Sequence, residues 1–242
     1  SSSSAASDVY KRQLLYFREV NTQNNSNLKK TPRSTVKRAP KRGLYDAPSI
    51  YEILDRNHIC HVGILHEGAP LVIPTLYGRK GNTLYIHGAS VSRLITRLEE
   101  AIPLSLSVAK TTGLVLARSA FHHSLNYESV VLFGAGRLVP EADKMEALKA
   151  VSDHLIPGRW EEVRKPNTKE LKATKVIAIP LEEVTAKVRS GGPKDDPADD
   201  ELALWAGVVP IKEIYEAPIA DSTLNKNMEL PKSVTNLYNL KS

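Results

Sequence analysis

The sequence predicts a β-rich α+β domain with a barrel core, and three observations lead to that class. Short apolar runs follow one another closely, breaks containing glycine separate several of them, and helical periodicity appears in only a few places. Closely spaced runs of this kind are typical of antiparallel hairpins. Long alternating strand–helix units are missing, which argues against a doubly wound parallel sheet.

The first apolar runs follow a short expected helix around Ile50 and Leu54, which Asp46 or Ser49 could cap. Pro74 lies inside one of the strand-like runs. Because proline cannot donate to a strand ladder, it indicates an edge, a bulge or a place where another group meets the backbone. The runs that we expect to form hairpins in this part of the chain are 58–65, 70–77 and 82–87.

Two helices interrupt the later strands. The segment 92–100 switches to helical spacing, and 141–155 has the clearest helical period of the chain. The strand-like run 129–139 begins almost entirely apolar, so we expect it to be central. The other strand-like or apolar segments are 102–109, 113–120, 175–181 and 202–211.

Composition divides the 242-residue chain into three parts. Residues 1–42 are polar and lack apolar periodicity, so we expect a disordered arm. Residues 43–212 form the expected folded domain, and 213–242 a loosely structured tail. No stretch approaches the roughly 20 apolar residues that span a bilayer. The single cysteine, Cys60, excludes a disulfide framework and favours a reducing compartment, so we expect a cytoplasmic protein.

The net charge of +6 belongs to the arm rather than to the folded domain. Seven of the 33 basic residues lie between positions 29 and 42, which contain no acidic residue, and the rest of the chain has 26 basic against 27 acidic residues. A basic arm can bind nucleic acid or anionic lipid without specificity. The alternative is a solvated leader or a strap across a partner subunit. We favour the alternative, because the domain shows no matching basic face.

The junction from Tyr85 to Arg93 is the first candidate site. A strand ends in small and hydroxylic residues, a helix begins, and Arg93 adds a planar cation. Free N–H groups at a helix start favour a phosphate. The structural alternative is an ordinary cap by Ser90 or Ser92 with a solvated Arg93.

Two further segments are weaker candidates. A flat ring could bind the backbone of Val72, Ile73, Pro74 and Thr75, although a plain edge strand explains them equally well. Trp205, beside small residues, could cover a flat cofactor or belong to the core.

Other chemistry is not expected from the motifs. His58 and His61 are three positions apart in a strand and therefore point to opposite faces, so we expect no metal site. Phosphate loops of the Walker and GxGxxG types and a G-x-S-x-G elbow are absent. Cys60 lies in an apolar strand, which indicates a packing residue.

Taken in order, several segments resemble the pyridoxamine 5′-phosphate oxidase-related, FMN-binding split-barrel proteins. The most similar branch contains flavin-nucleotide-binding and 5-nitroimidazole-resistance proteins. The resemblance covers about residues 37–212. It is carried by Arg42-Gly43 with Tyr45-Asp46, HVGIL, PLVIPTLY, LYIHGASVSRL, NYESVVLFGAGRLV, the stretch ELKATKVIAIPLEEVTAKVRSGGP and LWAGVVP.

The resemblance implies a six-stranded antiparallel split β-barrel that forms a homodimer, with flavin mononucleotide (FMN) at the subunit interface. It implies that Arg93 and Ser92 hold the FMN phosphate and that His87 and Gly88 lie along the ribityl chain or ring edge. The backbone of residues 72–75 would meet the isoalloxazine. Ser129 and Trp205 match polar and aromatic positions near the flavin.

The sequence also departs from the oxidases themselves. They follow the phosphate-site arginine with a lysine, where this chain has Leu94, and they carry an Arg-x-His pair after the C-terminal tryptophan. Residues 206–218 contain neither arginine nor histidine. We therefore do not expect pyridoxamine 5′-phosphate oxidase activity.

The resulting hypothesis is an FMN-dependent oxidoreductase that passes electrons from a reduced nicotinamide to a small acceptor, as nitroreductases do. His87 is the candidate catalytic residue, because an imidazole titrates near neutrality. The alternatives are a non-catalytic FMN carrier or sensor, and a split-barrel protein that handles haem.

Overall fold

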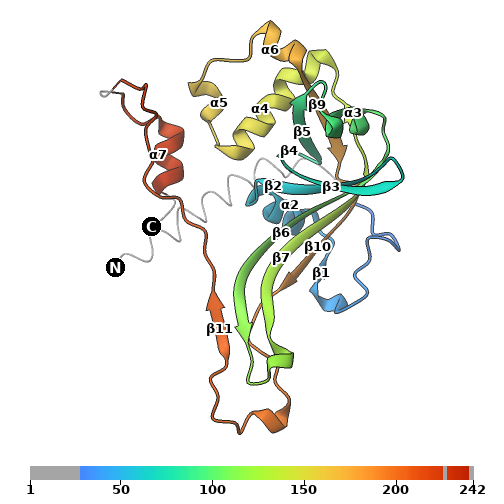
Figure 1. The fold of residues 1–242 in the computed structure, drawn as a ribbon, viewed down its shortest axis with the longest axis vertical. Helices are drawn as coiled ribbons and strands as arrows, with labels where there is room; N and C mark the ends of the chain where they lie inside the picture. The colour runs from blue at the N-terminus through green and yellow to red at the C-terminus, as the bar shows by residue number, and fades with distance from the viewer. Residues whose placement is uncertain (1–27, 226–227, 240–242) are drawn as a thin grey trace.

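The computed structural model, which describes residues 28–225 and 228–239, confirms a strand-rich α+β fold with a split barrel (Figure 1). Two antiparallel sheets form it. The larger has seven strands in the order β1-β10-β7-β6-β2-β3, with β11 paired to β6, and the smaller has the order β4-β5-β9-β8. Within the described residues, no helix has the length and apolar character needed to cross a membrane.

The sheets and helices have the following bounds. The large sheet contains β1 (Gly43–Leu44), β2 (Ile59–His66), β3 (Ala69–Leu76), β6 (Pro103–Leu116), β7 (Ser124–Ala135), β10 (Glu183–Arg189) and β11 (Gly207–Pro210). The small sheet contains β4 (Gly78–Lys80), β5 (Thr83–Ala89), β8 (Arg137–Leu138) and β9 (Thr174–Pro180). The α-helices are α2 (Ala47–Asp55), α3 (Arg93–Glu99), α4 (Lys144–Leu155), α5 (Arg159–Glu162), α6 (Thr168–Ala173) and α7 (Lys232–Asn239).

The β2–β3 hairpin shows how the sequence fixes local structure. Glu67 and Gly68 form its two-residue loop, and both have positive φ, as the hairpin turns that match strand twist require. The strand β3 pairs with β2 and ends the strand order of the large sheet, which confirms Pro74 as an edge residue. The strand β7 pairs on both sides, with β10 and β6, and is central as expected.

Two strand predictions need correction. The segments 102–109 and 113–120 are not separate strands, because β6 runs continuously from Pro103 to Leu116 and absorbs the break as a register shift between Thr111 and Gly113. A β-bulge bends a strand without ending it. The strand β10 was not expected at all. Val184 and Ala186 of this strand belong to the core, but Glu183, Thr185 and Lys187 between and beside them make the segment resemble a polar loop.

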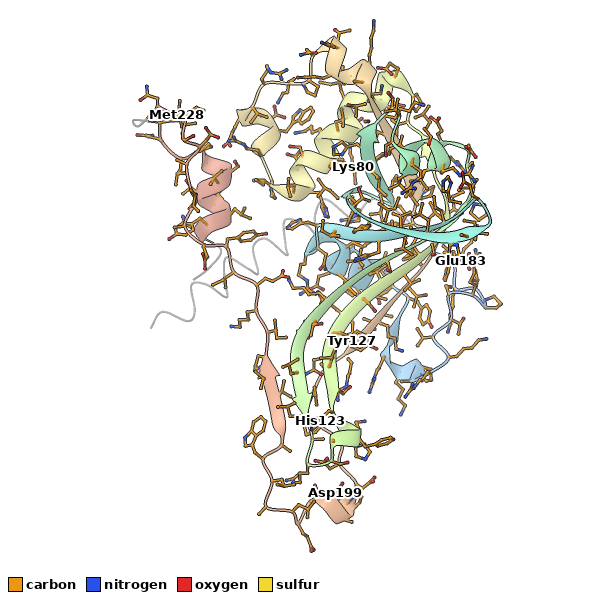
Figure 2. All side chains as sticks on the ribbon, viewed as in Figure 1. Lys80, His123, Tyr127, Glu183, Asp199 and Met228 are labelled. Atoms are coloured by element: carbon orange, nitrogen blue, oxygen red, sulfur yellow. The ribbon has the colours of Figure 1, made fainter. Side chains whose placement is uncertain are left out.

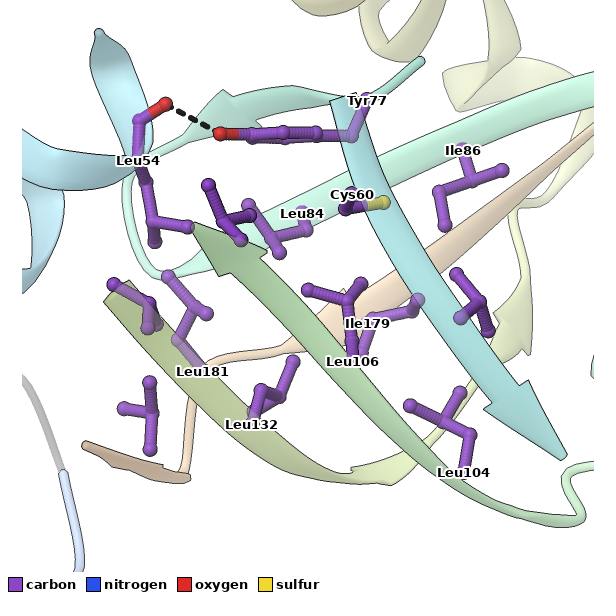
Figure 3. Packing of buried hydrophobic residues seen from close by; sticks show 14 of the residues in the cluster. Leu54, Cys60, Tyr77, Leu84, Ile86, Leu104, Leu106, Leu132, Ile179 and Leu181 are labelled. Atoms are coloured by element: carbon purple, nitrogen blue, oxygen red, sulfur yellow. Dashed lines mark hydrogen bonds between the residues drawn. The ribbon is translucent and has the colours of Figure 1, made fainter. Parts of the chain in front are cut away.

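One aliphatic core joins the two sheets (Figure 3). Alternate residues of β2, β6 and β7 point inward from the large sheet and meet Leu84, Ile86, Ile177 and Ile179 of the small sheet. Tyr77 is fully buried, and its hydroxyl donates to the carbonyl of Leu54 at 2.5 Å. Cys60 is buried in the same cluster, as expected, and burial raises the pKa of its thiol to about 12.

The basic arm differs from the expectation of disorder over residues 28–42. This segment lies along β10 as a strap, where Thr31 and Arg33 bind the carboxylate of Glu183, which Figure 2 labels. Thr185 donates to the carbonyl of the buried Ser34. The polar side chains of β10 therefore hold the strap, an effect that apolar periodicity does not reveal. The remainder of the predicted arm, residues 1–27, lies outside the described residues.

The tail also contains more structure than expected. After β11, the chain runs along the molecule and ends in α7 beside α5 (Figure 1). Ser233, at the start of α7, is buried and binds the carboxylate of Glu162 through both its backbone N–H and its hydroxyl. A helix of eight residues is marginal alone, so this tertiary contact accounts for its presence.

A buried ion pair joins α2 to the small sheet. The Arg79 guanidinium donates to the two carboxylate oxygens of Asp55 at 2.7 and 2.5 Å, and its side chain is only 4% exposed. It also donates to the carbonyl of Gly81 at 2.6 Å and lies 4.2 Å from the centre of the Tyr51 ring.

We expect Asp55→Ala to lower the free energy of unfolding by about 3–5 kcal/mol, because it leaves the Arg79 charge buried without its carboxylate. The matched control is Glu146→Ala, which removes the partner of the exposed Lys80 and should lower the free energy of unfolding far less, because solvent screens an exposed ion pair. Urea unfolding of both variants measures the difference. An equal decrease in the free energy of unfolding for both variants would show that the Asp55–Arg79 pair contributes no more to stability than a surface ion pair.

Candidate functional site

The junction between β5 and α3 forms through close packing. Gly88 faces the helix, and a Cβ atom at this position would lie 2.9 Å from Cγ1 of Ile95. Any larger residue would push α3 away from the strand. The requirement for glycine therefore comes first from packing, and its effect is to fix where Ser92 and Arg93 stand relative to the strand end.

Two polar side chains at this junction have no structural partner among the described residues. The hydroxyl of Ser92, the residue before α3, makes no capping hydrogen bond, although this position is where a serine usually caps. Arg93 is exposed, and its guanidinium forms no hydrogen bond or ion pair with any residue that the structure describes. On the same helix, Arg97 binds the carboxylate of Glu100. Arg93 is thus a cation free to bind an anion.

His87 adds an unsatisfied group to the same strand end. Its Nδ1 atom is buried and has no hydrogen-bond partner among the described residues. Burial lowers the pKa of the imidazole below its usual value, so the ring is neutral at neutral pH. A buried polar atom without a partner costs about 1–3 kcal/mol, which favours binding of a group that supplies one.

Three predicted residues share a second surface, the outer face of the large sheet. Along β3, Leu71 and Ile73 pack against the core, so Val72 and Pro74 point outward, and Ser129 of β7 points to the same side. The Ser129 hydroxyl donates to the carbonyl of Lys187 at 3.2 Å. Thr75 lies on the core side with Ile73, and its hydroxyl lies 3.4 Å from the carbonyl of Leu76.

The structure does not bring Trp205 to these surfaces within one chain. Its side chain is 67% exposed and packs against Gly207, where a Cβ atom would lie 2.9 Å from the indole. Figure 1 shows β11 at the opposite end of the molecule from α3. If Trp205 covers a ligand at the junction, it must come from a second copy of the chain.

One residue of the outer face was not among the predicted site residues. His61 is exposed there, paired with Pro74 on one side and Ser107 on the other. We considered it only as a partner of His58 for a metal. Strand alternation alone would have placed it on the same face as Val72 and Pro74 once the inward residues of β2 were identified.

These features define a split-barrel protein with free polar groups at one strand–helix junction. The chain belongs to the pyridoxamine 5′-phosphate oxidase family, whose sequence model matches residues 46–188. The match contains every predicted site residue except Trp205. No match was found among curated proteins.

Solved structures give similar relatives. The chain is 33% identical to an FAD and haem binding protein from Mycobacterium smegmatis, with a TM-score of 0.79 and coverage of 81% of this chain and 97% of that one. It is 36% identical to a flavocytochrome from Azotobacter vinelandii, with a TM-score of 0.81 and coverage of 88% and 99%. A 5-nitroimidazole antibiotic resistance protein from Bacteroides thetaiotaomicron shares the fold at 24% identity, with a TM-score of 0.51 and coverage of 60% and 86%.

We expect the His87 imidazole to be neutral at pH 7, with its pKa below the usual value of about 6.5. Burial penalises the charged ring, which gives the direction of the shift. An NMR titration of the imidazole signals measures it, with His87→Gln used to assign the resonance. A midpoint at or above the usual value would contradict the burial of this ring.

Proposed function

We propose that the protein is a flavin-binding oxidoreductase whose flavin phosphate binds at the β5–α3 junction. The free guanidinium of Arg93 carries this proposal, because the free Ser92 hydroxyl lies beside it and no described carboxylate neutralises it. Arginine binds phosphate through paired, charge-assisted hydrogen bonds. Membership of the oxidase family and the two flavin-containing relatives support the choice of a flavin.

The residues present fit such a cofactor. His87 precedes Gly88 at the end of β5, and its unpartnered Nδ1 offers a second polar group on the face of the strand opposite to the one that packs on α3. The strand β3 ends the strand order of its sheet, so one edge of its backbone is available to a flat ring, and β3 and β5 contact each other. A flavin supplies hydride and electron transfer, and the protein orients it. His87, neutral at neutral pH, would hold or deliver a proton at its ring nitrogen.

The proposed flavin is FMN, and FAD is the alternative that a relative favours. Both share the phosphate that Arg93 would bind, so the junction alone does not separate them. Chromatography of the cofactor released from the purified protein distinguishes them. Turnover with a reduced nicotinamide and a small acceptor distinguishes an oxidoreductase from a carrier or sensor. Because residues 206–218 lack the Arg-x-His pair, we propose no pyridoxamine 5′-phosphate oxidase activity.

Haem binding is a second candidate function. Two relatives at 33% and 36% identity, which match nearly their whole length, are an FAD and haem binding protein and a flavocytochrome. A haem beside the flavin would give the electrons a route within the protein. A Soret band in the purified or haemin-loaded protein tests this candidate independently of flavin content.

We also propose that the protein is a cytoplasmic homodimer. The strand β11, which begins two residues after Trp205, lies at the opposite end of the molecule from α3 (Figure 1), so the flavin-proximal position that the resemblance implies for Trp205 requires a second subunit.

We expect Arg93→Ala to weaken FMN binding by about 2–3 kcal/mol, or roughly 30- to 150-fold, because it removes a charged phosphate contact. Riboflavin, which lacks the phosphate, should bind the variant as it binds the native protein. Quenching of flavin fluorescence measures both affinities.

The matched control is Arg97→Ala, four residues along the same helix, where the guanidinium already binds Glu100. It should leave FMN affinity nearly unchanged. Equal losses for FMN and riboflavin, or equal losses in the two variants, would remove Arg93 from the phosphate site.

We expect light scattering to give twice the chain mass of 26.7 kDa. In a Trp160→Phe variant, Trp205 is the only tryptophan, and flavin binding should quench its fluorescence in the dimer. Dilution into the monomer should abolish the quenching, because the indole is remote from its own junction. A monomer that holds flavin with Trp205 quenched would refute the trans arrangement.

A further inference from the structure

The seven histidines differ in what their rings already bind. Five have partners. Three rings form hydrogen bonds: His58 with the Tyr215 hydroxyl at 3.2 Å, His123 with the N–H of Ala117 at 3.0 Å, and His154 with the carbonyl of Asn57 at 2.8 Å. Two rings lie beside carboxylates: His66 is 4.0 Å from Glu67, and His122 is 3.4 Å from Asp196. The rings of His61 and His87 bind no residue that the structure describes. His87 lies at the proposed flavin site, which leaves His61 without an assigned role.

His61 lies on the outer face of the large sheet, in the strand next to the edge strand β3. Across the strands, its row consists of Pro74, His61, Ser107 and Val131, and the next row begins with Val72 and Gly63. The neighbouring side chains are short, so the imidazole is not shielded and is exposed. Val72 and Val131 add exposed apolar surface on either side of it.

The surroundings suit a flat apolar ligand better than a bare metal ion. A protein site for zinc needs three or four side-chain ligands, and calcium needs more. Among the described residues, no group of three or more His, Cys, Asp or Glu could hold a metal ion. Haem brings four nitrogen ligands of its own, so one imidazole completes a binding site. Its macrocycle then needs apolar contact, which the valines supply.

We propose that the outer face of the large sheet binds haem and that His61 is the axial ligand of its iron. The inference rests on the proposed haem binding, which it deepens by naming the surface and the ligand. His61 pairs directly with Pro74, a residue of the strand proposed to meet the flavin ring. Paired strands lie about 5 Å apart, so a haem on His61 would adjoin the flavin-binding strand.

The test compares His61→Gly with His66→Gly, a control on the same strand whose ring lies beside Glu67 at the hairpin. Each purified full-length chain is titrated with haemin, and the Soret band, the haem content and the flavin content are measured. The native protein and the control should bind about one haem per chain. His61→Gly should lose more affinity than the roughly 10- to 100-fold that removal of an outer-shell partner costs.

Rescue by free imidazole separates ligation from general damage. In His61→Gly, added imidazole should restore the native Soret position, because the small molecule can take the place of the missing ring. Ser107→Phe tests the surface without touching the ligand. It places a bulky ring beside His61 across the β2–β6 pair and should reduce haem binding while flavin content is unchanged.

The possible results distinguish the assignment of His61 from the proposals that the protein binds haem and flavin. Native protein that binds flavin but no haem overturns both haem binding and the assignment of His61, and leaves the flavin proposal intact. Native protein that binds haem, with His61→Gly giving the same affinity and spectrum, overturns the assignment alone. The assignment of His61 would also be overturned if His61→Gly loses haem and imidazole does not restore it, while Ser107→Phe still binds haem fully.

Discussion

Both candidate surfaces depend on the single core that the two sheets share. Strand alternation sends every second residue of β2, β6 and β7 into this core, and Ile86 and Ile177 of the small sheet meet them there. Once the inward set is fixed, the outward set has no freedom. His61 must point outward because Cys60 and Val62 point inward, and His87 must point away from the core because Ile86 enters it. A slip of one residue in either strand would exchange the two sets and destroy the core.

The same constraint explains why the two sites differ in character. At the end of β5, Gly88 faces α3 and His87 points to the opposite face of the strand, where burial keeps the ring neutral with one nitrogen unsatisfied. On the outer face of the large sheet, His61 is exposed among the short side chains of its cross-strand neighbours Pro74 and Ser107. The first surface favours a single anchored group, a phosphate held by Ser92 and Arg93. The second favours a broad, flat ligand.

Much of the fold and part of the site could be predicted from the sequence, and the omissions have physical causes. Hairpins, the capped helix at Asp46 and the edge position of Pro74 follow from local patterns, and the structure contains them. The strap over residues 28–42 and the helix α7 depend on polar contacts with Glu183 and Glu162, which are remote in sequence. No local pattern reports such contacts. His61 was overlooked as a site residue because its importance lies in the row of neighbours that strand pairing creates.

The edge strand β3 connects these observations. An unpaired strand edge invites pairing with another strand, and proteins usually blunt it. Here Pro74 removes one donor, so a further strand could not complete its ladder at this position. Val72 and Pro74 nevertheless stay exposed, on the face that carries His61, and their strand contacts β5, which leads into α3 and Arg93. An edge that is protected from strand pairing but left uncovered is free to meet a ligand. That combination explains how one short strand can serve both surfaces, with its backbone available to a flavin and its outward side chains flanking the histidine.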